Sequence, residues 1–108
     1  MVTPPVTGPA PDGWPFAQPV NEAAVTVWPI LRREKPILFV CHDADGWQFL
    51  TGETFSMSEA AVVALRTVFK IDESVGELAD LPEGWQAMRT APGQPWARHR
   101  LADNSSAG

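Results

Sequence analysis

Two apolar runs separated by a turn sequence constrain this chain more than any other feature. Ile37–Cys41 is apolar at every position, and Trp47–Leu50 carries a single polar residue. Between them stands Asp45-Gly46, a pair typical of tight hairpin turns because glycine accepts a positive φ at little cost. The pattern predicts a β-hairpin. Because the first run lacks polar alternation, we expect it to be a central strand that is covered on both faces.

A glycine directly precedes a tryptophan at three places, Gly13-Trp14, Gly46-Trp47 and Gly84-Trp85. In each case an acidic residue stands before the glycine. The glycine suits a tight turn, and the tryptophan can bury a large apolar surface as the chain re-enters the domain. These pairs indicate architecture and carry no chemistry of their own.

The chain before the hairpin predicts a short strand followed by a short helix. Ala23–Val25 is the expected strand, and Thr26 is a suitable N-cap for a helix that ends at about Arg33. Pro29 would fall in the first turn of that helix, where the missing amide proton of proline is not needed.

A second helix is expected to begin at Ser56, because Ser56 and Glu59 have the spacing of a capping box. The apolar residues that follow recur at helical spacing, which is typical of an amphipathic helix on a sheet. They are Val62, Leu65, Val68 and Phe69. An alternative interpretation makes 62–64 a short strand and begins the helix near Leu65.

The remaining elements complete a small α+β fold. Asp72 and Ser74 offer a second helix cap, Pro82 ends that turn, and Trp85–Arg89 alternates as a final strand. We therefore expect an α+β domain with a small antiparallel or mixed sheet, helices packed on one face of it, and flexible termini.

The 108 residues are expected to form one domain at 21–100, between a proline-rich flexible arm at 1–20 and a disordered tail at 101–108. The arm holds six of the eleven prolines. Its two aromatic residues, Trp14 and Phe16, are placed to hold the end of the arm against the domain.

The charge distribution argues against a nucleic-acid partner. The formal net charge is −5, and residues 43–83 contain nine acidic residues against two basic ones, a net charge of −7. A phosphate-binding surface needs clustered cations, whereas an acidic surface suits a basic protein. The candidate partner-binding residues are Asp43, Asp45, Glu77 and Asp80. We expect the basic residues Arg98 and Arg100 to belong to a loose tail.

Membrane insertion and export are not expected either. The sequence contains no run of about 20 apolar residues, the length that spans a bilayer, and no segment typical of a signal peptide follows Met1. Cys41 is the single cysteine, so no internal disulfide can form, which fits a reducing compartment. We expect a cytoplasmic protein.

A set of residues distributed over roughly 14–98 resembles a family of small uncharacterised bacterial proteins. The set includes His42-Asp43, Gly46-Trp47-Gln48-Phe49-Leu50-Thr51-Gly52, Asp72, Ser74, Asp80-Leu81-Pro82, Gly84-Trp85, Arg89 and Pro95-Trp96. The Gly-Trp-Gln-Phe-Leu-Thr-Gly stretch is also similar to a domain family assigned to the immunity proteins of polymorphic toxin systems. Cys41 and Glu73 depart from the family pattern, which has a small polar residue and a proline there. The resemblance implies a cytoplasmic protein that binds a protein partner such as a cognate toxin, and it implies no catalytic residue.

A nucleophilic triad is suggested only by the residue types at three consecutive positions, Cys41, His42 and Asp43. Neighbours on a strand point to opposite faces, so Cys41 and His42 cannot act on one substrate atom. Cys41 is instead expected to be a buried structural residue. We therefore expect a noncatalytic interaction domain without a cofactor or bound metal. The alternative is a small metal-dependent accessory protein or enzyme centred on His42, Asp43 and Asp45, and a homodimer through a sheet edge is a third possibility.

Overall fold

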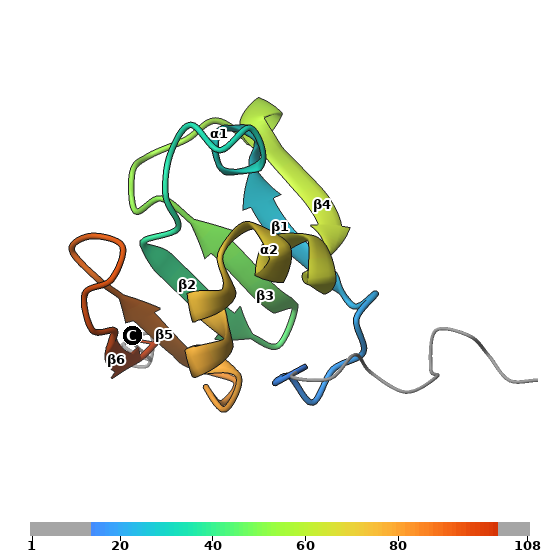
Figure 1. The fold of residues 1–108 in the computed structure, drawn as a ribbon, viewed down its shortest axis with the longest axis vertical. Helices are drawn as coiled ribbons and strands as arrows, with labels where there is room; N and C mark the ends of the chain where they lie inside the picture. Colours follow the sequence, from blue (N-terminus) through green and yellow to red (C-terminus); the bar gives the residue numbers. More distant parts are fainter. Residues whose placement is uncertain (1–13, 102–108) are drawn as a thin grey trace, which may run out of the picture.

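The computed structural model describes residues 14–101 (Figure 1). They form one six-stranded sheet with a few short helices. The strands are β1 Ala23–Val27, β2 Phe39–Asp43, β3 Gly46–Leu50, β4 Ala60–Ala64, β5 Trp85–Met88 and β6 Ala97–Arg100. The helices are α1 Trp28–Leu31 and α2 Leu65–Ile71, with 3-10 helices η2 Met57–Glu59 and η3 Glu73–Leu78. No helix within 14–101 is long and apolar enough to cross a bilayer.

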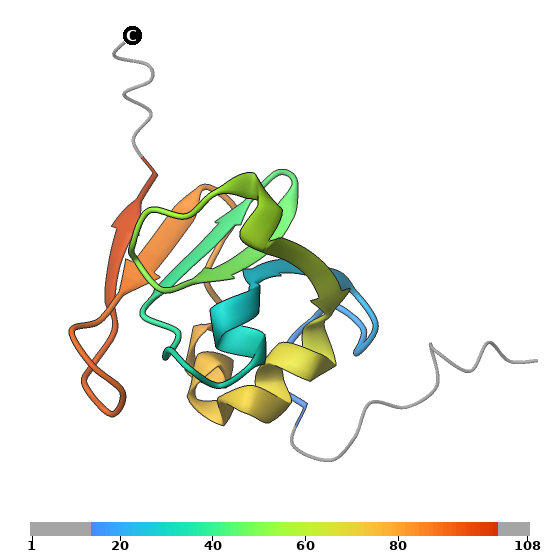
Figure 2. The same cartoon turned by 90° about the horizontal axis from the view of Figure 1, so that it is seen from above.

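The sheet is mixed, with the strand order β4-β1-β3-β2-β5-β6. Only β1 and β3 run parallel, and every other neighbouring pair is antiparallel. The helices α1, α2 and η3 lie on one face of the sheet (Figure 2). The expected α+β fold, with a mixed sheet and helices on one face, is confirmed. That helical side is called the inner face below, and the opposite side the outer face.

The predicted hairpin is present as β2 and β3, with Asp43 paired to Gly46 across the turn. Gly46 has a φ of +116°, the left-handed conformation that favours glycine. The first strand begins at Phe39, two residues later than expected, and continues to Asp43. It lies between β3 and β5 and is buried or half-buried along its length, although helices cover only its inner face.

The segment after the hairpin differs from the expected long helix. Residues 57–59 form a single 3-10 turn, and the chain then extends as β4 before α2 begins at Leu65. The side chain of Ser56 makes no capping bond and instead contacts the hydroxyl of Ser58. Pairing with β1 over five residues outweighs the local helical spacing. The capping-box prediction was therefore wrong, and the alternative of a strand at 62–64 with a helix from Leu65 is confirmed, with the strand beginning two residues earlier.

Thr26 is not the N-cap of α1. It lies inside β1, where its Oγ1 donates a hydrogen bond of 2.8 Å to the carbonyl oxygen of Phe49. Val27 is the N-cap, with no side-chain cap bond, and Pro29 lies in the first turn as expected. The helix ends at Leu31, shorter than predicted. The buried hydroxyl of Thr26 gains more from a cross-strand acceptor than from a helix end.

The C-terminal part of the domain contains one strand more than the sequence indicated. Asp72 caps η3 as predicted, and Trp85–Met88 is β5. The predicted final strand is followed by β6, which pairs with β5 from Ala97 to Arg100. Every residue of β6 is exposed, so it carries no apolar alternation from which a strand could be recognised. The expectation of a loose tail at Arg98 and Arg100 was therefore wrong.

The core lies between the inner face of the sheet and the helices. Its largest fully buried side chains are Trp47, Phe49, Ile30, Ile37, Leu65, Leu78 and Leu81. Phe16 is only 5 % exposed and stands edge-on to Trp47 at 5.4 Å between ring centroids. Residues 14–20 of the predicted arm thus contact the domain, whereas 1–13 and 102–108 lie outside the described residues. Gly76 lies so close to this segment that an added Cβ would stand 2.9 Å from Pro15 Cγ.

The other tryptophans surround this core. Trp14, Trp85 and Trp96 are half-buried, and Trp14 donates from its indole nitrogen to the carbonyl oxygen of Gln18 at 2.8 Å. Trp28 is 46 % exposed.

Candidate functional site at the acidic end

Two loops meet at one end of the sheet. The amide of Gly84 donates to the carbonyl oxygen of His42 at 2.7 Å, which joins the loop before β5 to the end of β2. The His42 Nδ1 atom lies 2.7 Å from the carbonyl oxygen of Leu81, which fixes the same loop a second time. As a result, the β2–β3 turn and the loop between η3 and β5 lie together at the lower end of the view in Figure 1.

These loops and the end of η3 carry most of the acidic residues that the sequence singled out. We call this surface the acidic end; it comprises Asp43, Asp45, Glu77, Asp80 and Glu83. All of them except the half-buried Asp43 are exposed. The structure therefore brings the four predicted partner-binding residues to one region and adds Glu83, which adjoins them through Gly84.

Asp43 shapes the turn more than it offers charge to solvent. Its Oδ1 accepts a hydrogen bond of 2.8 Å from the amide of Asp45, and its Oδ2 accepts a longer one of 3.4 Å from Gln48. The Cys41 thiol lies 4.0 Å from the same Oδ2. Asp43 is thus the positioning residue of the turn, while Asp45 projects as its free carboxylate.

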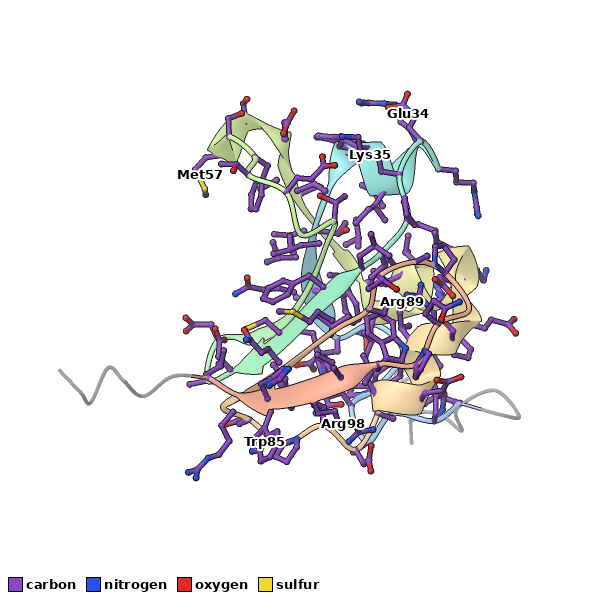
Figure 3. All side chains as sticks on the ribbon, turned by 90° about the vertical axis from the view of Figure 1, so that its left-hand side faces the viewer. Glu34, Lys35, Met57, Trp85, Arg89 and Arg98 are labelled. Carbon is purple, nitrogen blue, oxygen red and sulfur yellow. The ribbon has the colours of Figure 1, made fainter. Side chains whose placement is uncertain are left out.

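Basic residues from β6 border the acidic end. Arg98 Nη2 donates at 2.9 Å both to Asp80 and to the carbonyl oxygen of Glu77. Figure 3 shows Arg98 and Trp85 near one end of the β5–β6 hairpin. The hydrogen bond and charge of Arg98 lower the pKa of Asp80. Asp80 keeps 80 % of its side chain exposed, so the ion pair leaves its carboxylate accessible.

Not every acid of 43–83 belongs to this surface. Glu53 pairs with Lys35 in the loop after β3, and Asp72 pairs with Arg89 beneath the sheet. The acidic end thus holds five of the nine acidic residues of the stretch, and two of the other four, Glu53 and Asp72, are paired with neighbouring cations.

His42 and its neighbours on β2 point to different sides, as strand geometry requires. The His42 ring lies on the inner face, stacked on Trp47 at 4.0 Å between centroids and only 8 % exposed. Cys41 and Asp43 lie on the outer face. The pKa of the Cys41 thiol is raised, mainly by burial and to a smaller extent by the negative charge of Asp43. The structure thus does not bring His42 together with Asp43 and Asp45. Within 14–101 no three potential metal ligands cluster.

A buried ionic network near the other end of the sheet was not recognised from the sequence. The side chain of Arg89 is 1 % exposed and forms a 2.6 Å ion pair with Asp72. Its guanidinium also donates twice to the carbonyl oxygen of Ile37 and once to the hydroxyl of Ser74. The ring of Trp96 lies 4.2 Å from the guanidinium carbon, on the loop visible beside Arg89 in Figure 3. These contacts connect η3, the segment before β2 and the β5–β6 loop, so we assign the network to stability.

An open groove of about 380 Å³ adjoins this network on the side away from the acidic end. It is lined mainly by apolar residues of β2, β3 and β5, namely Phe39, Leu50 and Met88, with Glu53 at its rim. The groove contains no nucleophile or cluster of titratable groups that suggests a reaction.

The ion pair of Asp72 predicts a pH dependence of stability. Burial alone would raise the pKa of Asp72, but hydrogen bonds from Ser74 and the Arg89 guanidinium lower it below 3.8. When folding lowers the pKa of a carboxyl group, the ionised group stabilises the folded protein. This contribution is complete above the pKa of the unfolded state and is lost as the pH falls through the pKa of the folded state. We expect the wild type to have a higher free energy of unfolding than the Asp72→Asn variant, and we expect this difference to be largest at neutral pH. The margin should shrink below about pH 4.

Urea titrations of both proteins across this range provide the measurement. A margin that is independent of pH would show that the charge of Asp72 contributes nothing to the free energy of unfolding.

No family model, curated protein or solved structure matches this chain.

Proposed function

We propose that this chain is a noncatalytic domain that binds a basic protein partner through the acidic end. The observation that carries the proposal is that two acidic segments are joined at one end of the sheet: the β2–β3 turn, which holds Asp43 and Asp45, and η3 with the loop after it, which hold Glu77, Asp80 and Glu83. The two nearby cations, Arg98 and Arg100, leave this region with a net charge of −3.

Several features of the acidic end suit recognition of a folded protein. The loops are fixed by hydrogen bonds to the buried strand β2, so the carboxylates of Asp45 and Glu83 are held without ordering a flexible segment. A preorganised surface loses less entropy on binding. Complementary charge also accelerates encounter and discriminates among partners, and both effects weaken with added salt.

The resemblance to immunity proteins of polymorphic toxin systems suggests which kind of partner to expect. Under this proposal the partner is a cognate toxin with a basic surface, and the domain acts by covering that surface without chemistry of its own. A cytoplasmic location, where such a toxin would be met, belongs to the same proposal.

The first experiment is copurification of partners with the tagged full-length chain from its native lysate, at low and at moderate salt. We expect a basic protein that is retained at low salt and lost as salt rises. Binding of the purified partner is then compared between Asp45→Lys/Glu83→Lys and Glu34→Lys/Glu53→Lys. Both double variants change the net charge by +4, but the second pair lies outside the acidic end.

The first double variant should weaken binding about tenfold or more, which corresponds to about 1.4 kcal/mol, and the second should leave it nearly unchanged. Equal effects of the two variants would assign the binding to net charge alone and contradict the site. A well-folded protein that retains no partner at low salt would contradict the proposed function itself.

A further inference from the structure

We propose that two copies of this chain associate through β4, whose free edges pair antiparallel about a two-fold axis at Val62. The proposal does not rest on the function proposed above, because none of the β4 residues belongs to the acidic end. In Figure 1 β4 forms one outer edge of the sheet, and within residues 14–101 β1 is its only neighbouring strand.

The main-chain groups of β4 are arranged for such pairing. The amide of Leu65 donates to the carbonyl oxygen of Glu22 at 2.7 Å, just beyond the end of the β1–β4 ladder. Along an antiparallel strand the residues whose groups face one neighbour alternate with those that face the other side. Leu65, Val63 and Ala61 therefore face β1, and the N–H and C=O groups of Ala60, Val62 and Ala64 point to the free edge.

The side chains of β4 offer no protection for this edge. Its sequence is Ala-Ala-Val-Val-Ala, without a charge or a proline, and Val62 is 70 % exposed. Soluble proteins usually protect free edges with charged residues, prolines or bulges, because an apolar edge pairs with other strands. The opposite edge, β6, has the sequence Ala-Arg-His-Arg and is protected in this way. The contrast between the two edges indicates that β4 has a partner.

Charge complementarity identifies the partner strand as a second copy of β4. In an antiparallel pairing centred on Val62, Ala60 of each copy lies opposite Ala64 of the other. In the same register, Glu59 of one copy lies opposite Leu65, the first residue of α2, in the other copy. The next residue, Arg66, is exposed, so Glu59 and Arg66 of different copies come close together. Neither Glu59 nor Arg66 forms an ion pair within 14–101. The two-fold axis would create this pair twice.

The apolar surface near the edge supports the same contact. Val62 lies opposite Val25 on the outer face. Pairing of the two copies at Val62 would therefore place the Val25–Val62 pair of one copy next to that of the other in one continuous row. Met57 in η2 is 81 % exposed and projects from the corner of the molecule that adjoins β4 (Figure 3). An interface of one short strand per copy is small, so we expect a concentration-dependent dimer.

Sedimentation velocity of the full chain over a wide range of concentration tests the proposal. The wild type should shift from monomer to dimer as concentration rises. Val62→Pro removes an N–H that points to the free edge and spares the β1 ladder, so it should remain folded and monomeric. Val62→Lys should act in the same way, whereas the control Met88→Lys, an apolar-to-lysine change on β5 of the outer face, should still dimerise.

A charge exchange tests the two-fold geometry. Glu59→Arg and Arg66→Glu should each weaken the dimer about tenfold, and the variant that carries both changes should recover most of the loss. Circular dichroism melting confirms that every variant is folded. A wild type that stays monomeric at all concentrations would overturn the proposal, as would a dimer that survives both changes at Val62. Failure of the double exchange to restore association would overturn the two-fold register.

Discussion

Replacement of Arg89 by alanine is expected to lower the free energy of unfolding by about 3–5 kcal/mol, the usual cost of breaking a buried ion pair. The side chain is 1 % exposed, and its removal leaves the Oδ2 atom of Asp72 and the carbonyl oxygen of Ile37 without their donors. It also removes the cation that lies over the ring of Trp96. For a domain of this size each kcal/mol lowers the melting temperature by about 4–8 °C.

Arg98→Ala is the matched control, because Arg98 forms an ion pair of similar length with Asp80 on the surface. Exposed pairs contribute about 0–1 kcal/mol, so this variant should unfold within about 1 kcal/mol of the wild type. Urea denaturation at neutral pH compares the two. Equal losses for Arg89 and Arg98 would refute the idea that the buried network holds η3 against the sheet.

Replacement of Trp47 by alanine should cost about 3–5 kcal/mol, as for other fully buried aromatic residues. Trp47 is 1 % exposed and contacts His42, Phe49 and Phe16 through its ring. The substitution would leave a cavity at the centre of the inner face and remove the surface on which Phe16 anchors the N-terminal segment. Limited proteolysis should therefore cleave the variant near residues 14–20 faster than the wild type.

Two further variants separate the contributions of Trp47. Its indole nitrogen has no hydrogen-bond partner within the described residues, so Trp47→Phe sacrifices no hydrogen bond and should cost clearly less than the alanine variant. Trp28→Ala serves as the control, because Trp28 is 46 % exposed and its loss should change stability by less than about 1 kcal/mol. A Trp47→Phe variant as unstable as Trp47→Ala would show that shape at this position matters more than apolar area.

Several of the residues that the sequence analysis singled out have structural roles. Asp72, Ser74, Arg89 and Trp96 form the buried network, and Trp47 occupies the centre of the core. Gly84 has a φ of +89° and directly precedes β5.

The candidate site was predictable only in part. Composition identified a stretch of excess acid, and Asp43, Asp45, Glu77 and Asp80 do lie at one end of the sheet. The position of Glu83 beside the β2–β3 turn was not predictable, because it depends on the hydrogen bond between Gly84 and His42. Nor does the sequence indicate that Glu53 and Asp72 are neutralised, because their partners are 18 and 17 residues away along the chain.

The sequence by itself determined the elements whose signals are local. The Asp-Gly turn between apolar runs specified the hairpin, and the Asp72 carboxylate two residues before Ser74 specified the start of η3. Only the tertiary structure determined the conformation of residues 60–64, which form the strand β4 because they pair with β1 over five residues. It also made β6 a strand and Arg89 a buried cation. Long-range pairing and burial outweigh local propensity, since each supplies more free energy than the preferences of single residues.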